Sequence, residues 1–356
     1  MDLLESDCFD FILHKIRKTF RLTQFPHITK SGIWETTKDG HWTGGFWIGL
    51  LWWAYKISGN VIFKKNAYKW LNLLEKRKKS RTFDLGFLFY PSFVLGYEFT
   101  NDPRLKEVAL KAAETLSKTV NKKLEFLYDE KTIDGEIFRE IIIDIMPNLS
   151  LLWWAYEETG NEEYYNIAYI HSIKMLKELI REDNSTYQGM IFDLNTSEII
   201  KKGTFQGISV DSCWSRGQAW GIYGYASAYK MTKENQFLDV AKNLAMYFIS
   251  NLPEDYVPYW DFNATKALDT IRDSSAAAIA CSGILDIYKY TQDKKFRNYA
   301  IKILNSLIKN YLTKKDGDGI LAKGCFYKKK NLGVHESLIW GDYYFVEALI
   351  KLNQLE

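Results

Sequence analysis

The chain has 356 residues, of which 47% are hydrophobic, 26% charged and 16% aromatic, a composition typical of a globular protein with a large core. Its net charge of +3 gives no support for a protein that coats nucleic acid or another polyanion, although it is compatible with a small acidic substrate. Twelve tryptophans and only six prolines favour long uninterrupted helices and flat aromatic surfaces of the kind that stack on sugars.

The sequence indicates neither a membrane span nor a secretion signal. The longest apolar run, Phe46 to Tyr55, is shorter than the roughly 18 residues of a membrane helix. Acidic residues interrupt the N-terminal apolar stretch, unlike in a signal peptide, and the four cysteines lack the spacing of a zinc site or disulfide framework. We expect a cytoplasmic protein, monomer or homodimer, with no metal or other cofactor and no nucleic-acid or membrane partner.

One string of residues occurs twice, at an offset of 101 positions. Leu-Leu-Trp-Trp-Ala-Tyr occupies residues 50–55 and 151–156, and a Gly-Asn pair follows each copy at 59–60 and 160–161. Each copy is typical of an apolar helix that ends in a left-handed turn and leads into the N-cap of the next helix. Weaker echoes of this pattern end at residues 97–102, 229–233 and 288–293.

The pattern predicts twelve helices, alternately buried and exposed. Ser6–Phe20 is the first, and segments apolar nearly all round, suited to inner positions, follow at Gly44–Tyr55, Phe83–Tyr97, Met146–Tyr156, Gln218–Tyr229, Ala276–Tyr288 and Gly341–Leu352. Amphipathic segments suited to outer positions include Pro103–Thr119, Glu162–Arg181, Asn235–Ser250 and Lys294–Tyr311. Strand patterns of period two are scarce.

Six inner and six outer helices predict an all-α fold, a closed (α/α)6 barrel or six-hairpin toroid, formed by a single domain over residues 1–356. A linear solenoid is the competing architecture, but the turns are unevenly spaced and terminal caps are not evident. The longer connections are expected to gather at one end of the barrel and to carry the functional site. They are residues 21–41, 121–143, 183–214, 251–272 and 313–337.

Two carboxylates stand alone in apolar segments, at the expected starts of neighbouring inner helices. Asp84 lies in Phe-Asp-Leu-Gly-Phe, and Asp144 in Ile-Asp-Ile-Met-Pro-Asn. Because an ionised carboxylate is costly to bury without partners, each must cap its helix, pair with another group, or take part in chemistry. An apolar setting raises the pKa of a carboxyl, as a general acid requires. Capping and catalysis both remain open at this point.

A polar stretch at residues 204–221 places an arginine between two indoles, with glutamine amides on both sides. Arginine offers a planar fork to a carboxylate, and indoles stack on the face of a sugar. The alternative is that Trp214 and Trp220 pack in the core while Arg216 pairs with Asp211.

Six strings, taken together and in order, resemble the unsaturated glucuronyl hydrolases of glycoside hydrolase family 88. They are His-Trp-Thr-Gly-Gly-Phe-Trp at 41–47, Phe-Asp-Leu-Gly-Phe at 83–87, Asp-Ile-Met-Pro-Asn at 144–148, Trp-Ser-Arg-Gly-Gln-Ala-Trp at 214–220, Asp-Ser-Ser-Ala-Ala-Ala at 273–278 and Trp-Gly-Asp-Tyr-Tyr at 340–344. The resemblance implies an (α/α)6 barrel and an unusual reaction. Such enzymes hydrate the C4=C5 double bond of the unsaturated uronic acid that polysaccharide lyases leave at the non-reducing end of an oligosaccharide.

The resemblance also implies roles for individual residues. Asp144 matches the general acid/base of the family, and Asp84 its second essential aspartate. The positions that match the substrate-binding pocket are Trp42, Gln188, Gln206, Trp214, Arg216 and Trp220. Gln188, Phe205 and Phe83 stand where relatives commonly carry histidine, and an amide can bind a hydroxyl but cannot titrate near neutral pH.

Other functions remain open from the sequence. The basic loop Phe326–Asn331 differs from the Ser- and Lys-containing loop of family members that accept sulfated glycosaminoglycan fragments, so chondroitin, hyaluronan, heparin and pectin-derived aglycones are all considered. A related unsaturated rhamnogalacturonyl hydrolase would use the same barrel and chemistry. A sugar epimerase would need clustered catalytic histidines, which the five histidines here do not predict, and in a non-catalytic glycan-binding barrel Asp84 and Asp144 would only cap helices.

Overall fold

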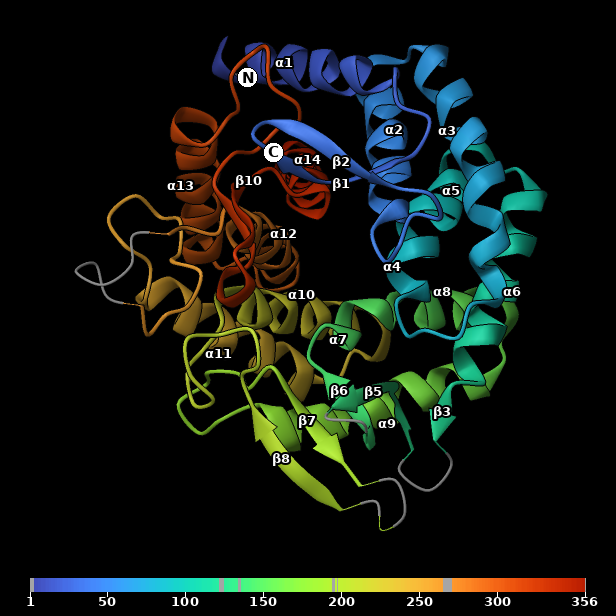
Figure 1. Cartoon of the computed structure of the whole chain (residues 1–356), viewed down its shortest axis with the longest axis vertical. Helices are drawn as coiled ribbons and strands as arrows, with labels where there is room; N and C mark the ends of the chain where they lie inside the picture. Colours follow the sequence, from blue (N-terminus) through green and yellow to red (C-terminus); the bar gives the residue numbers. More distant parts are fainter. Residues whose placement is uncertain are drawn as a thin grey trace.

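The helices form a ring of hairpins with one layer of helices inside another (Figure 1). The structure is a computed structural model and describes residues 3–121, 125–133, 136–193, 196, 198–264 and 271–355. The inner layer consists of α2 (Gly44–Ser58), α4 (Leu85–Phe89) continued by the π-helical η2 (Tyr90–Val94) and α5 (Leu95–Thr100), α7 (Ile145–Asn148) continued by α8 (Ser150–Thr159), α10 (Ser215–Thr232), α12 (Ser274–Thr291) and α14 (Ile339–Gln354). Figure 1 shows these helices around the centre of the ring.

The outer layer alternates with the inner one along the chain. It consists of α1 (Leu3–Thr19), α3 (Val61–Leu74), α6 (Pro103–Ser117), α9 (Glu162–Leu179), α11 (Asn235–Ser250) and α13 (Lys294–Asn310). The ring is closed, because α14, the last helix, packs against α2 near the start of the chain, and β1 packs against β10. Closure confirms the predicted (α/α)6 barrel and excludes the linear solenoid.

The repeated turns act as the sequence predicted. Gly59 and Gly160 adopt left-handed backbone conformations at the ends of α2 and α8, with φ of 65° and 68°. The next residue in each case, Asn60 or Asn161, accepts a hydrogen bond from a backbone N–H of the following helix. This device turns the chain from an inner helix to an outer one within a few residues.

Short antiparallel sheets occupy the connections, which the scarcity of strand patterns did not predict. Three are two-stranded: β1 (Phe25–Lys30) with β2 (Ile33–Thr37), β3 (Val120–Asn121) with β4 (Phe126–Leu127), and β9 (Gly324–Tyr327) with β10 (Leu332–Glu336). A fourth sheet orders β5 (Asp129–Ile133), β6 (Glu136–Ile142), β7 (Gly189–Phe192) and β8 (Ile199–Gly203) in sequence. Two short 3-10 helices complete the elements, η1 (Glu75–Lys79) and η3 (Lys328–Lys330).

The sheets lie at the end of the barrel where the inner helices begin. Hydrogen bonds join this end of the barrel across long sequence separations, such as the Arg216 guanidinium of α10 with the Phe326 carbonyl and the Thr29 hydroxyl with Glu336. Residues 122–124, 134–135, 194–195, 197 and 265–270 of the expected connections lie outside the described residues.

Helices α4 and α7 approach each other unusually closely. A Cβ atom added to Gly86 would lie 2.2 Å from the backbone oxygen of Asn148. Asn148 is fully buried, its Oδ1 accepts a 2.6 Å hydrogen bond from the backbone N–H of Phe87, and its Nδ2 donates to the carbonyl of Asp144. This contact fixes the first turns of the two helices, and therefore Asp84 and Asp144, relative to each other.

Substitution of Gly86 tests this contact. We expect Gly86→Ala to lower the free energy of unfolding by about 1–3 kcal/mol, because the added methyl group must force the two helices apart. Gly317→Ala is the matched control, since a Cβ there would find no heavy atom closer than 3.6 Å. Thermal and denaturant unfolding of both variants measure the difference, and equal stabilities would show that the α4–α7 contact yields without strain.

Candidate active site

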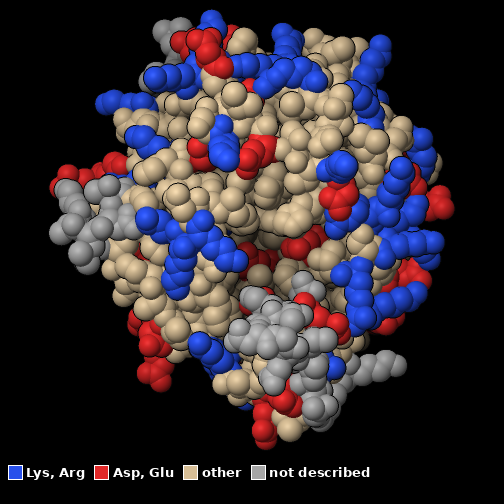
Figure 2. All heavy atoms as spheres, viewed as in Figure 1, with Lys and Arg blue, Asp and Glu red and all other residues tan. Residues whose placement is uncertain are grey.

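A cleft of about 310 Å³ opens at the end of the barrel where the inner helices begin. Figure 2 shows a hollow near the middle of this face, with acidic groups at its floor and groups of lysine and arginine on either side. Seven of the eight site residues predicted from the sequence line the cleft: Trp42, Asp84, Asp144, Gln188, Gln206, Trp214 and Arg216. The structure therefore brings together side chains from five separate segments.

Asp84 and Asp144 occupy the N-cap positions of α4 and α7, yet neither side chain makes a capping hydrogen bond. Asp102 and Asp273, at the starts of other helices, cap through their side chains in the ordinary way. Asp84 instead accepts a hydrogen bond from the Thr82 hydroxyl, 3.2 Å away. Capping alone therefore does not explain either carboxylate, and both face the cleft.

Burial raises the pKa of Asp144 from its ordinary value of 3.8 to about 7. Oδ1 of this carboxyl is buried and has no hydrogen-bond partner among the described residues. The positive charge of Arg216 and the Trp220 indole favour the ionised form, whereas the Glu140 carboxylate opposes it. Removal of the carboxyl group from water has the largest effect on its pKa, so Asp144 can hold a proton near neutral pH at the wall of an open cleft.

Arg216 is held rigidly in the wall of the cleft by partners on two other segments. Its guanidinium donates to Asp273 at 2.7 Å and to the backbone carbonyls of Cys325 and Phe326 at 2.5 and 2.6 Å. It also lies over the Trp214 ring, 4.4 Å from the ring centroid. The alternative pairing with Asp211 is wrong, because the acidic partner of Arg216 is the fully buried Asp273.

Gln188 and Gln206 form a reciprocal pair of amides. Nε2 of Gln188 donates to Oε1 of Gln206 at 2.7 Å, and Oε1 of Gln188 accepts from the backbone N–H of Gln206 at 2.6 Å. Nε2 of Gln206 also donates to the carbonyl of Phe326. The pair holds both amides in place at the wall of the cleft without a group that titrates there. Phe83 and Phe205, at the two other positions where relatives commonly carry histidine, also line the cleft.

The three predicted tryptophans have different surroundings. Trp42 is half-buried and lies against Trp340, with ring centroids 4.7 Å apart, while Trp214 is almost fully buried beneath Arg216. Trp220 does not line the cleft, so it is not placed to stack on a ligand as expected. It is fully buried behind Phe87, with the two ring centroids 5.0 Å apart, and its indole lowers the pKa of Asp144.

Sequence reasoning missed several residues of the cleft. Glu140 comes from β6, a strand that was not predicted, and Phe87 lies one turn into α4. Tyr327 and Lys330 come from the basic loop, whose lysines gave a signal for charge but not for position. No group of three or more His, Cys, Asp or Glu side chains in the described part of the chain is arranged to hold a metal ion.

Known proteins of one family are similar to this chain over nearly its whole length. The model of Glycosyl Hydrolase Family 88 matches residues 13–353. An unsaturated chondroitin disaccharide hydrolase of Streptococcus pneumoniae is 37% identical over 334 residues, which are 91% of this chain and 84% of that protein. An unsaturated glucuronyl hydrolase of Bacillus sp. (strain GL1) is 33% identical over 345 residues, 93% of this chain and 91% of that protein.

Solved structures agree with the sequence relatives. The crystal structure of the unsaturated glucuronyl hydrolase from Bacillus sp. GL1 superposes with a TM-score of 0.91 at 30% identity, covering 99% of this chain and 96% of that one. An unsaturated glucuronyl hydrolase described as specific for heparin has a TM-score of 0.93 at 28% identity, over 100% and 98% of the two chains. This chain belongs to glycosyl hydrolase family 88, and it is a glycosidase with the (α/α)6 fold.

The raised pKa of Asp144 predicts how stability depends on pH. Below about pH 4 this carboxyl is protonated in both folded and unfolded chains, so it contributes no difference. Between about pH 4 and pH 7 the unfolded chain ionises first, which lowers the stability of the folded state, and above pH 7 that loss is constant.

Asp144→Asn removes the ionisation. We expect the variant to gain stability over the wild type as the pH rises from 4 to 8, on the order of 2 kcal/mol, a value reduced from 1.36 kcal/mol per pKa unit because the residue is partly exposed. Denaturant unfolding at several pH values measures the gain. A difference that does not change with pH would mean that Asp144 titrates normally.

Proposed function

We propose that this chain is an unsaturated glucuronyl hydrolase that releases the 4,5-unsaturated uronic acid from the non-reducing end of glycosaminoglycan disaccharides, with Asp144 as general acid and base. The observation that carries the proposal is the Asp144 carboxyl, which lines the cleft, makes no capping hydrogen bond and has a pKa raised by burial to about 7, in a chain of this family. The proposal treats the chain as a single catalytic domain.

The proposed reaction begins at the double bond, not at the anomeric carbon. The C4=C5 bond belongs to an enol ether, so a proton added to C4 leaves positive charge on C5 and the ring oxygen. Protonated Asp144 donates that proton, water adds to C5, and the Asp144 carboxylate takes a proton from that water. The resulting hemiketal opens and releases the neighbouring sugar, so the carboxylate-separation rule for ordinary glycosidases does not apply.

The other residues of the cleft bind and position the substrate in this proposal. Asp84 accepts hydrogen bonds from the hydroxyl groups of the uronate, and the paired amides of Gln188 and Gln206 orient its polar edge. The flattened ring stacks on Trp42, the half-buried indole of the cleft.

Arg216 binds and positions the anionic sugar without taking part in proton transfer. An isolated guanidinium beside C5 would oppose the positive charge that develops there. The 2.7 Å ion pair with Asp273 offsets part of that charge while it keeps the guanidinium fork in place. Trp214 supports the fork from below, and Trp220 acts as a positioning residue for Asp144.

Similarity favours an unsaturated chondroitin disaccharide as the substrate, because the Streptococcus pneumoniae relative carries that activity in its name. Tyr327 and Lys330, on the basic loop, stand at the wall of the cleft where a second sugar can lie. The competing substrates are unsaturated heparin disaccharides, since one similar structure is described as specific for heparin, and pectin-derived rhamnogalacturonan disaccharides.

An absorbance assay tests the function. We expect the near-ultraviolet absorbance of the conjugated C4=C5 carboxylate to disappear on incubation with unsaturated chondroitin disaccharide, and more slowly with heparin and rhamnogalacturonan disaccharides. Asp144→Asn should lower kcat by about 10²–10⁴-fold, the usual contribution of a general acid–base group, and should leave KM nearly unchanged. No loss of absorbance with any of the three substrates, or full activity of Asp144→Asn, would contradict the proposal.

Glu140 offers a second test through the pH profile. Activity requires protonated Asp144, so we expect kcat to fall as the pH rises through about 7. Glu140→Gln removes a negative charge that raises the pKa of Asp144, so the fall should begin at lower pH. Glu35→Gln, on an exposed position of β2, is the charge-matched control and should leave the profile unchanged.

A cytoplasmic location and a monomeric or homodimeric state belong to the same proposal. Cys213 and Cys281 are buried free thiols, as a reducing compartment maintains. None of the helices in the described part of the chain combines the length and apolar character of a membrane span. Cell fractionation and the molar mass in solution test these two points.

A further inference from the structure

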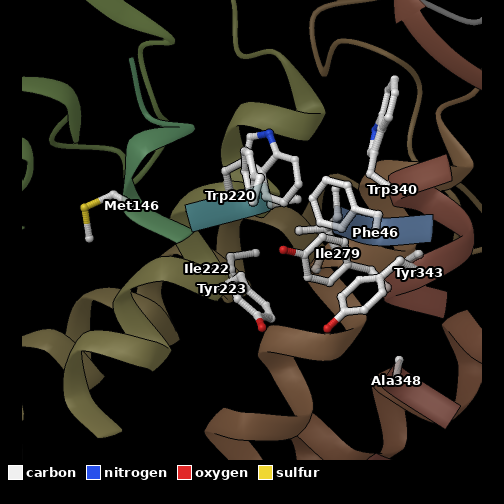
Figure 3. Packing of buried hydrophobic residues seen from close by; sticks show 14 of the residues in the cluster. Phe46, Met146, Trp220, Ile222, Tyr223, Ile279, Trp340, Tyr343 and Ala348 are labelled. Atoms are coloured by element: carbon white, nitrogen blue, oxygen red, sulfur yellow. The ribbon is translucent and has the colours of Figure 1, made fainter. Parts of the chain in front are cut away.

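A second cavity lies at the opposite end of the barrel, where the inner helices end. Its volume is about 380 Å³, larger than that of the cleft, and its lining comes from α2, η2, α5, α10, α12 and α14. Figure 3 shows the hydroxyl groups of Tyr223 and Tyr343 on the side away from Trp220 and Trp340, which belong to the other end. We call this cavity the far-end pocket.

The floor of the far-end pocket is a buried polar network around Glu347. This carboxylate is only 5% exposed. It accepts hydrogen bonds from the hydroxyls of Tyr343 at 3.1 Å and Tyr223 at 3.4 Å, and it forms an ion pair with Lys351. Lys351 also donates to Asp286 at 2.6 Å. Such a network is expensive to bury, and a hydrophobic floor would close this end of the barrel at lower cost.

The walls and rim of the pocket combine aromatic rings with balanced charge. Trp53 and Tyr290 are half-buried and provide flat apolar surfaces. Three carboxylates and three ammonium groups line the cavity, so it carries no net charge that would select an anion or a cation. They are Glu98, Asp286 and Glu347, with Lys230, Lys289 and Lys351.

We propose that the far-end pocket is a second binding site, for a neutral polyhydroxylated molecule of the size of a monosaccharide or disaccharide. Aromatic walls bind the apolar faces of a pyranose ring, while phenols, carboxylates and ammonium groups at the floor and rim both donate to and accept from its hydroxyls. The volume lies within the range of pockets that enclose small molecules, about 300–1,000 Å³.

The two sites are separate along the axis of the barrel. Between them lies a cavity of about 10 Å³, lined by Phe87 on the side of the cleft and by Tyr90, Tyr223 and Tyr343 on the side of the far-end pocket. A space of this size holds at most about one water molecule. A sugar in the far-end pocket therefore cannot occupy the cleft, and variants at one end can be used to test binding at the other.

Binding of D-galactose and N-acetyl-D-galactosamine to the full chain, measured by saturation-transfer NMR and calorimetry, tests the proposal. We expect saturable binding of these neutral sugars, and weaker binding of the charged D-glucuronate and D-glucosamine. Ser227→Trp fills the pocket from α10, and Gln354→Trp fills it from the exposed end of α14. Each should weaken sugar binding by at least about tenfold, which is 1.4 kcal/mol, and should retain hydrolase turnover as a check of folding.

Trp42→Ala, at the cleft, is the matched control and should leave the binding of the neutral sugars unchanged. Three results would overturn the proposal: no saturable binding of either neutral sugar, equal binding by the wild type and by a folded pocket-filling variant, or loss of binding in Trp42→Ala. The last result would place the sugar in the cleft. Failure of the far-end pocket to bind sugar would leave the proposed hydrolase activity untouched, because that activity is measured with a different substrate at the other end.

Discussion

The contact between Gly86 and Asn148 determines the geometry on which the candidate site depends. Two inner helices can touch backbone to backbone only where no side chain stands between them, and Gly86 allows the backbone of α4 to touch that of α7. The Asn148 amide then joins the two helices by hydrogen bonds to Phe87 and Asp144. Asp84 and Asp144 precede these joined turns directly, so their positions follow from packing in the core.

The charged groups of the cleft are arranged so that the guanidinium of Arg216 pairs with Asp273 and not with Asp144. Burial raises the pKa of Asp144 to about 7, whereas the Arg216 guanidinium is paired with the buried Asp273. A direct pair between Arg216 and Asp144 would lower the pKa of the carboxyl and remove the acid. The buried Asp273, which also caps α12, prevents this because it accepts a hydrogen bond from the guanidinium of Arg216. In the proposed reaction, substrate binding and proton donation therefore use neighbouring side chains.

The sequence predicted the barrel well because the fold repeats one physical device. Each inner helix is apolar nearly all round, and each hairpin turn pairs a left-handed residue with an N-cap, so periodicity and turn chemistry agree. The sheets were not predicted because their strands are short and their faces are mixed. In β6, for example, Phe138, Glu140 and Ile142 alternate with Arg139 and Ile141, so neither face is uniformly apolar.

Site residues on helix starts were predictable for the same reason, since Asp84, Asp144 and Arg216 are polar residues in apolar segments. Contacts across long sequence separations were not. The pairing of Arg216 with Asp273 spans 57 positions, and its contact with Phe326 spans 110. The burial of Trp220 depends on its contact with the Phe87 ring, which lies far away in the chain, so no local pattern encodes it.

The direction of the inner helices explains why the two ends of the barrel differ. All six inner segments begin at the end of the barrel that holds the cleft, so the positive ends of their dipoles point to that end, which suits the anionic sugar of the proposed reaction. The same field should favour an ionised Asp144, so its raised pKa shows that desolvation is the stronger effect. At the far end the negative ends converge, and lysines occupy the last turns of α2, α10, α12 and α14. Those lysines offset the dipoles and the carboxylates together, which leaves the far-end pocket polar but without net charge.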